Sequence, residues 1–120
     1  MPKIAAISIY VHDINQAEDF YSNLLCFKVT DRPAPFLVEL EHDGLPLMLC
    51  AAERASSTHY SKDSGTVLGL ATRDVVRQAA DLRAKGATVL FDEPQEFPVG
   101  VFNVVRDPSG NAIELLEFRQ

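Results

Sequence analysis

The chain has 120 residues, 47% of them hydrophobic and 23% charged, and its formal net charge is −6 at pH 7. This composition is typical of one globular domain and excludes a disordered chain, and the acidic charge argues against a nucleic-acid partner. The longest apolar run, residues 4–11, is too short to span a membrane, so we expect a cytoplasmic protein with no membrane partner. Cys26 and Cys50 lack CxxC spacing, so we expect small buried hydrophobic residues rather than a disulfide framework.

The first half of the chain is predicted to form a βαβββ module. Aliphatic residues alternate with smaller or more polar ones over residues 4–11, which indicates a strand with two different faces. A capping-box pattern from Asn15 to Glu18 opens an apolar stripe at helical spacing, so a helix is expected over residues 15–25. Three strands are expected next, at residues 27–31, 36–41 and 45–50, with a turn at residues 42–44 between the last two.

The second half repeats this order after a polar segment, residues 52–65, which we interpret as a linker. A strand is expected at residues 66–72, and Asp74 is expected to cap a helix that ends at Gly86. Three strands follow, at residues 88–92, 99–106 and 111–118. The sequence therefore predicts one domain of two tandem modules, at about residues 1–51 and 66–120.

The motif "DPSGNAIELLE" near the end of the chain places a carboxylate in an apolar strand. Asp107 to Asn111 has the chemistry of a tight turn, because proline presets φ while glycine and asparagine tolerate positive φ. Glu114 follows in the middle of the strand. It either points to solvent from a half-buried sheet, or lines a pocket as a metal ligand or a general base.

These features together resemble the vicinal oxygen chelate superfamily, which includes glyoxalase I, extradiol dioxygenases and bleomycin-resistance proteins. The resemblance rests on the paired segments "YVHDINQAEDFYSNLLCFKV" and "ATRDVVRQAADLRAKGATV" and on the closing motif with Glu114. It implies an α+β fold in which two βαβββ modules form an eight-stranded, cup-shaped mixed sheet with the helices outside. One departure is Cys26, which stands where the family usually has glycine, so this helix end is expected to differ in shape.

The resemblance also implies where a metal would bind. The family's four ligand positions correspond to Ala6, Met48, Val67 and Glu114. Of these side chains, only the Glu114 carboxylate suits a hard or borderline metal, since alanine and valine have no lone pair and a thioether suits soft ions. We therefore expect no metal and no other cofactor.

The cup implied by the resemblance would present a mainly apolar wall with a few polar groups, as small-molecule pockets usually do. Aromatic residues of the strands could stack on a planar ligand, and two residues of the linker could form a lid. The expected ligand-binding residues are Ser8, Tyr10, Phe36, Met48, His59, Tyr60, Phe102 and Glu114. Phe97 is a further candidate for stacking, and each aromatic residue is alternatively part of the core.

Three functions remain open from the sequence. The first and favoured one is a metal-independent protein of the bleomycin-resistance type, which binds or sequesters a small molecule and confers antibiotic resistance. The second is a metal-free enzyme with lyase or isomerase chemistry, in which Glu114 is the catalytic general base. The third is a glyoxalase-like or dioxygenase-like enzyme that uses a divalent metal. A homodimer is expected in each case, because this is the superfamily's common state.

Overall fold

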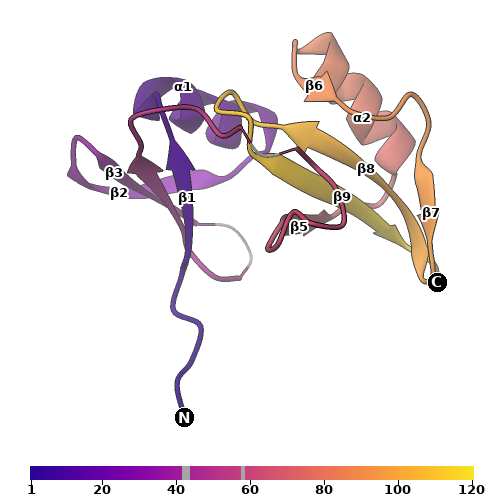
Figure 1. Ribbon diagram of the computed structural model, residues 1–120, viewed down its shortest axis with the longest axis horizontal. Coiled ribbons are helices and arrows are strands. Elements are labelled where there is room, and N and C mark those ends of the chain that lie inside the picture. The colour runs from indigo at the N-terminus through magenta and orange to yellow at the C-terminus, as the bar shows by residue number, and fades with distance from the viewer. Residues whose placement is uncertain (42–43, 58) are drawn as a thin grey trace. The chain divides into compact units, whose positions relative to one another are not determined.

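The computed structural model describes residues 1–41, 44–57 and 59–120, and the chain divides into two compact units, Met1–Ser56 and Ser57–Gln120. Each unit has one mixed sheet and a helical segment packed against it, so the expected α+β class is confirmed (Figure 1). The turn expected at residues 42–44 includes His42 and Asp43, which lie outside the described residues. None of the helices in the described ranges is long and apolar enough to cross a membrane.

The first unit contains a four-stranded sheet with the order β1-β4-β3-β2. Its strands are β1 (Ile7–Val11), β2 (Lys28–Ala34), β3 (Leu37–Glu41) and β4 (Leu47–Ala51). Strands β1 and β4 are parallel, and the other neighbours are antiparallel. One face buries alternate residues of β3 and β4, namely Val38, Leu40, Leu47 and Leu49, on the side of the helix. Residues between them, such as Met48, therefore lie on the opposite face.

The helix of this unit begins one residue earlier than the sequence pattern indicates. Helix α1 (Ile14–Asp19) is capped by Asp13, whose carboxylate accepts a hydrogen bond of 3.0 Å from the backbone N–H of Gln16. The interpretation of Asn15 as the start of a capping box was therefore wrong, because Asp13 already satisfies the first free amide groups. The helix continues as a π-helical turn, η1 (Phe20–Leu24), after which the Leu25 N–H bonds to the Phe20 carbonyl at 3.3 Å.

Cys26 ends this helix in the left-handed conformation, with φ of 64°. Gly86 also has a positive φ, 90°, at the matching end of the second module. The closing hydrogen bonds differ, because the Phe27 N–H bonds to the Tyr21 carbonyl, six residues back, whereas the Ala87 N–H bonds to the Leu82 carbonyl, five residues back. The cysteine itself adopts the left-handed conformation that glycine favours, while the π-helical turn before it gives this terminus a shape unlike that at Gly86. The expectation that both cysteines are buried is also wrong, because Cys26 is exposed and Cys50 is half-buried.

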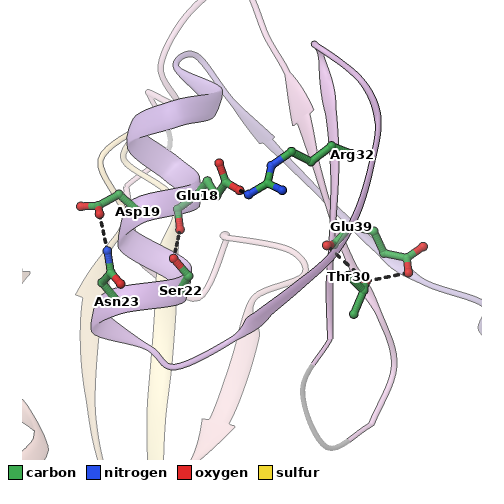
Figure 2. A network of polar contacts seen from close by, with 7 residues as sticks. All are labelled: Glu18, Asp19, Ser22, Asn23, Thr30, Arg32 and Glu39. Atoms are coloured by element: carbon green, nitrogen blue, oxygen red, sulfur yellow. Dashed lines mark hydrogen bonds and ion pairs between the residues drawn. The ribbon is translucent and has the colours of Figure 1, made fainter.

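Polar side chains make contacts within the helix of the first unit, between this helix and strand β2, and between β2 and β3. Figure 2 shows Arg32 of β2 reaching the Glu18 carboxylate of α1, with which it forms an ion pair. On the neighbouring strand β3, Glu39 accepts a hydrogen bond of 2.8 Å from the Thr30 hydroxyl. Within the helix, the Ser22 hydroxyl donates to the Glu18 carbonyl at 2.7 Å. These contacts are largely exposed, so each adds little to stability.

The second unit has a five-stranded sheet in which β5, β9, β8 and β6 are neighbours in that order and β7 pairs with β8. Its elements are β5 (Leu68–Ala71), α2 (Val75–Ala84), β6 (Thr88–Val89), β7 (Gln95–Phe97), β8 (Gly100–Arg106) and β9 (Ala112–Phe118). Asp74 caps α2, as expected, by accepting a hydrogen bond of 3.0 Å from the Arg77 N–H. The Glu117 carboxylate also accepts a hydrogen bond of 2.8 Å from the Val75 N–H.

Strand β7 is an addition to the predicted pattern. The described residues form nine strands, where the sequence predicts eight. Pro94 and Pro98 flank β7 and hide its short strand signal, because proline normally interrupts a strand. Strand β6 also ends at Val89, earlier than the strand predicted over residues 88–92.

The turn between β8 and β9 forms as its sequence predicts. The Asp107 carboxylate, only 4% exposed, accepts hydrogen bonds from the Ser109 N–H at 2.9 Å and the Asn111 N–H at 2.8 Å. The Asn111 side-chain amide donates a third bond of 2.9 Å to the same carboxylate. Arg106 donates to the Gly110 carbonyl at 2.8 Å. This network fixes the start of β9 and thereby the register of Glu114.

Candidate functional site

Glu114 lies on the face of the second sheet that is turned away from α2. Its neighbours Ile113 and Leu115 are buried on the α2 side, and side chains alternate along a strand. Across the sheet, Glu114 is paired with Gly69 on one side and Val104 on the other. The Glu114 side chain is half-buried. The carboxylate therefore projects from the middle of a sheet face, with strands on both sides of it.

A hydrogen bond joins Glu114 to Tyr60, 54 residues earlier in the chain. The Tyr60 hydroxyl donates to Glu114 Oε2 over 2.5 Å. Burial, together with the hydrogen bond and the negative charge of Glu114, raises the pKa of Tyr60 from 10.0 to about 12. Each of these causes opposes the formation of a phenolate beside the carboxylate. Tyr60 is therefore a protonated hydrogen-bond donor throughout the physiological pH range.

The segment that carries Tyr60 is folded back on itself by serine side chains. The Ser64 hydroxyl accepts a hydrogen bond of 2.7 Å from the Ser61 N–H and donates one of 3.2 Å to the His59 carbonyl. The Ser61 hydroxyl accepts another, of 3.1 Å, from the Asp63 N–H. These short-range bonds hold the backbone on both sides of Tyr60, as serine residues commonly do in turns. The phenol is thus presented to Glu114 by a structured turn.

Phenylalanine rings form the apolar part of the site. The Phe91 and Phe102 rings meet edge to face, with centroids 6.1 Å apart and an interplanar angle of 88°. Phe97 extends this cluster, with its ring 5.8 Å from that of Phe102 and 6.0 Å from that of Phe118. Edge-to-face packing of this kind contributes beyond the burial of area alone. Phe91 and Phe102 of this cluster line the pocket and give it an aromatic side.

Between the Tyr60 segment and the sheet lies an open pocket of about 590 Å³. It is lined by Tyr60, Ser61, Lys62, Ser64, Gly65, Val67, Phe91, Phe102 and Glu114. The volume falls within the range of small-molecule sites, and the lining combines apolar rings with a few hydrogen-bonding groups. All of these lining residues belong to the second unit.

Gly69 leaves space beside the carboxylate. A Cβ atom at Gly69 would lie 2.9 Å from Leu116 Cδ1 and 3.9 Å from Glu114 Oε1. A side chain there would therefore press on Leu116 and cover part of Glu114. The absence of a side chain at Gly69 keeps this edge of Glu114 accessible.

The structure brings together three of the expected ligand-binding residues, Tyr60, Phe102 and Glu114, with Val67 beside them. His59 precedes Tyr60 but is exposed and does not line the pocket. Ser8, Tyr10 and Met48 lie together on one face of the first sheet, where Ser8 pairs with Met48. Phe36 is 63% exposed in the turn between β2 and β3. These four residues belong to the first unit, and their role in binding stays a prediction.

Sequence reasoning missed several residues of the pocket. Phe91 and the linker residues Ser61, Lys62, Ser64 and Gly65 were not among the expected ligand-binding positions. The linker residues carry no periodic pattern, so only their contacts with the sheet identify them. Phe91 falls within a predicted strand, and nothing in the local sequence distinguishes a pocket ring from a core ring.

The residues at the family's metal positions do not fit a metal ion. Glu114 already accepts a hydrogen bond from Tyr60, and Val67 beside it offers no donor atom. Ala6 is exposed just before β1, and Met48 offers only a thioether. Within the described parts of the chain, no group of three or more His, Cys, Asp or Glu side chains could hold a metal. No step through a metal can be derived from this set of residues.

Comparison with known proteins identifies the family. Comparison with curated protein sequences found no match. Among solved structures, the antibiotic-binding protein TnmS3 from Streptomyces sp. CB03234 is 25% identical, with a TM-score of 0.71 over 99% of this chain and 98% of that one. The trypanothione-dependent glyoxalase I of Leishmania major is also 25% identical, with a TM-score of 0.71 over 98% of this chain and 87% of that one.

A third structure, the lactoylglutathione lyase of Agrobacterium tumefaciens, shares the fold with a TM-score of 0.73 at 20% identity, over 98% of this chain and 94% of that one. The family model of the Glyoxalase/Bleomycin resistance protein/Dioxygenase superfamily matches residues 3–115. This match covers nearly the whole chain, including both modules and the turn before Glu114. The chain therefore belongs to the Glyoxalase/Bleomycin resistance protein/Dioxygenase superfamily.

Proposed function

We propose that this protein binds a small organic molecule in the pocket between Tyr60, Glu114 and the Phe91–Phe102 pair, without a metal and without chemical turnover. The observation that carries the proposal is the hydrogen bond between the Tyr60 hydroxyl and Glu114 Oε2 at the end of an aromatic pocket. A few fixed polar groups on an apolar wall orient a ligand and give specificity. Antibiotic binding by TnmS3 supports this class of function, since that protein is similar along the whole chain.

Binding is favoured over general base catalysis by the partner of Glu114. A general base must reach the proton that it removes, within about 2.6–3.2 Å. In this site one carboxylate oxygen already accepts a hydrogen bond from the Tyr60 hydroxyl, and the Tyr60 pKa of about 12 keeps the phenol from acting as a base itself. The pair is therefore better suited to recognising polar groups of a ligand than to moving protons.

Metal-dependent chemistry is the less favoured alternative, because the donor atoms it needs are missing. Two of the similar structures are a glyoxalase I and a lactoylglutathione lyase, so proteins of this fold include enzymes. In this chain the corresponding positions hold Ala6, Met48 and Val67 besides Glu114. Three protein ligands are usual in a catalytic zinc site, and this set supplies one suitable ligand.

A thermal-shift screen of antibiotics and metabolites tests the proposal. A ligand that binds only the folded protein raises its stability, by about 2.7 kcal/mol at 100 times the dissociation constant. We expect a hit to bind with one equivalent per chain by calorimetry and to be recovered chemically unchanged. Tyr60→Phe and Glu114→Gln should each weaken its binding.

The matched control is Glu96→Gln, which makes the same substitution at an exposed position of β7 in the same unit. Its affinity for the hit should equal that of the unchanged protein. Formation of lactoylglutathione, or steady conversion of any hit, would contradict the proposal if Glu114→Gln abolished it. Binding that neither Tyr60→Phe nor Glu114→Gln weakens would also contradict it, because the ligand would then occupy another site.

A further inference from the structure

Asn103 is a buried polar residue that the pocket does not contact directly. It lies on β8 with 1% of its surface exposed. Its Oδ1 accepts hydrogen bonds from the Phe91 N–H at 3.2 Å and from the Val104 N–H at 2.8 Å. Its Nδ2 donates to the Phe91 carbonyl at 3.0 Å. Both backbone groups of Phe91 are therefore bound by one side chain.

These bonds occur where the sheet is interrupted. Strand β6 pairs with β8 as far as Val89 and Val105, and the Leu90 N–H still bonds to the Val104 carbonyl at 2.8 Å. At the next residue the backbone pairing stops, and β7 resumes it opposite Phe102. The Asn103 amide offers a donor nitrogen and an acceptor oxygen with the spacing found in a peptide group, so it replaces the missing strand partner of Phe91.

Phe91 supplies one of the two phenylalanine rings that line the pocket. Its ring is set against that of Phe102 at 6.1 Å, and both residues line the cavity with Glu114 and Tyr60. We propose that Asn103 is a positioning residue of the ligand pocket, which fixes the Phe91 ring by binding both the backbone N–H and the backbone carbonyl of Phe91. This inference rests on the proposed binding function for its effect on affinity, but not for its effect on the ring.

The chemistry of the amide explains why other residues would not serve. Aspartate would retain the two accepted bonds, but it has no donor for the Phe91 carbonyl and would bury a charge. Leucine has a similar size and would leave the Phe91 N–H without a partner. Arg83 also donates to the Phe91 carbonyl, so this carbonyl keeps one bond in either variant. The ring should therefore be displaced more by Asn103→Leu than by Asn103→Asp.

The test compares Asn103→Leu and Asn103→Asp with a control, Val105→Ala. Val105 is fully buried two positions further along the same strand, so its truncation lowers stability without removing a bond to Phe91. The first readout is the nuclear Overhauser effect between the Phe91 and Phe102 ring protons in the ligand-free protein. The second is the dissociation constant of an aromatic probe, 1-anilinonaphthalene-8-sulfonate, measured by fluorescence below the unfolding temperature of each variant.

We expect the ring contact to be lost in Asn103→Leu, weakened in Asn103→Asp and kept in Val105→Ala. Probe affinity should fall by about tenfold in Asn103→Leu, since a site whose supporting residues are removed loses its geometry. It should change by less than about twofold in the control. Asn103→Asp covers the case in which Asn103→Leu does not fold.

The two readouts separate failure of this inference from failure of the proposed function. If the ring contact persists in both Asn103 variants, or if their affinities match that of Val105→Ala, the positioning role is overturned. If the unchanged protein does not bind the probe, the proposed function loses support. The ring contact still decides the role of Asn103 in that case.

Discussion

Tyr60 is a side chain whose ionisation reports on the pocket. Its pKa is raised to about 12 by burial and by the carboxylate of Glu114. Because the folded state holds the proton more tightly than the unfolded state, Tyr60 contributes stability that is present below pH 10 and lost as the pH rises toward 12. Between these pH values the free energy of unfolding falls as the pH rises, since the unfolded chain has fewer bound protons than the folded one.

We predict that Glu114→Gln lowers the pKa of Tyr60 toward the ordinary value of 10.0, because the negative charge is removed while the burial remains. The measurement is a pH titration of 13C-labelled tyrosine by NMR, which separates Tyr60 from Tyr10 and Tyr21. Glu96→Gln serves as the control and should leave the titration unchanged. An unaltered Tyr60 pKa in Glu114→Gln would show that the two side chains do not interact in solution.

Cys26 carries backbone strain in the first module. Its φ of 64° is a conformation that costs non-glycine residues about 1–2 kcal/mol. We predict that Cys26→Gly stabilises the protein by about 0.5–1 kcal/mol, after allowing for the greater freedom of glycine in the unfolded chain. Urea unfolding measures the difference. Cys26→Ala removes the thiol but keeps the strain, so it should not produce the gain; an equal gain in both variants would assign it to the thiol.

Gly100 begins β8 and lies close to the backbone of β9. A Cβ atom there would lie 1.9 Å from the Glu117 carbonyl oxygen, which belongs to the backbone and cannot rotate away. We predict that Gly100→Ala costs about 3 kcal/mol or more, because the strands must separate locally. The comparison is Gly69→Ala, where the contact is the movable end of Leu116, and the cost should be clearly smaller. Similar losses in the two variants would contradict this account.

The turn between β8 and β9 depends on one buried carboxylate. Asp107 accepts three hydrogen bonds from the residues that follow it. We predict that Asp107→Ala destabilises the protein by about 3 kcal/mol, since buried amide donors lose a charged acceptor. Chemical denaturation gives the value, and the exposed residue Asp92 provides the control, for which Asp92→Ala should have almost no effect. A small loss for Asp107→Ala would mean that water replaces the carboxylate.

The elements that the sequence predicts well are those whose signals are local. Asp74 and Gly86 mark the ends of α2, and the turn from Asp107 to Asn111 forms as expected. The features that the sequence does not predict depend on contacts with residues that are far away along the chain. Strand β6 ends early because the Asn103 side chain replaces the next backbone pair, and a polar residue within a strand gives no sign of this role.

The same distinction applies to the site. Glu114 is identifiable because a carboxylate in an apolar strand is unusual, and Tyr60 because the linker is longer than a connection requires. The bond between them joins residues 54 positions apart, which no local pattern encodes. Phe91 is hidden for the same reason, since its place in the pocket depends on Asn103.

At the scale of the whole molecule, the two modules share a plan but differ in chemistry. Met48 in β4 stands where the repeat places Glu114 in β9, and the first sheet leaves Tyr10 62% exposed.

We predict that the protein is a homodimer, the common state in its superfamily. Light scattering at micromolar concentration should give about twice the chain mass of 13.2 kDa, and the mass of a single chain would contradict the prediction.

The hydrogen bond between Tyr60 and Glu114 also affects which ligands can bind in the pocket. A compound that approaches Glu114 with its own donor must displace the phenol or share the carboxylate, and the separated Tyr60 hydroxyl then needs another acceptor. A compound that is only aromatic leaves the pair intact and meets no such cost. The affinity of the pocket should therefore depend strongly on the hydrogen-bond donor of the ligand and be higher for cationic donors than for neutral ones. It should depend less on the aromatic part of the ligand.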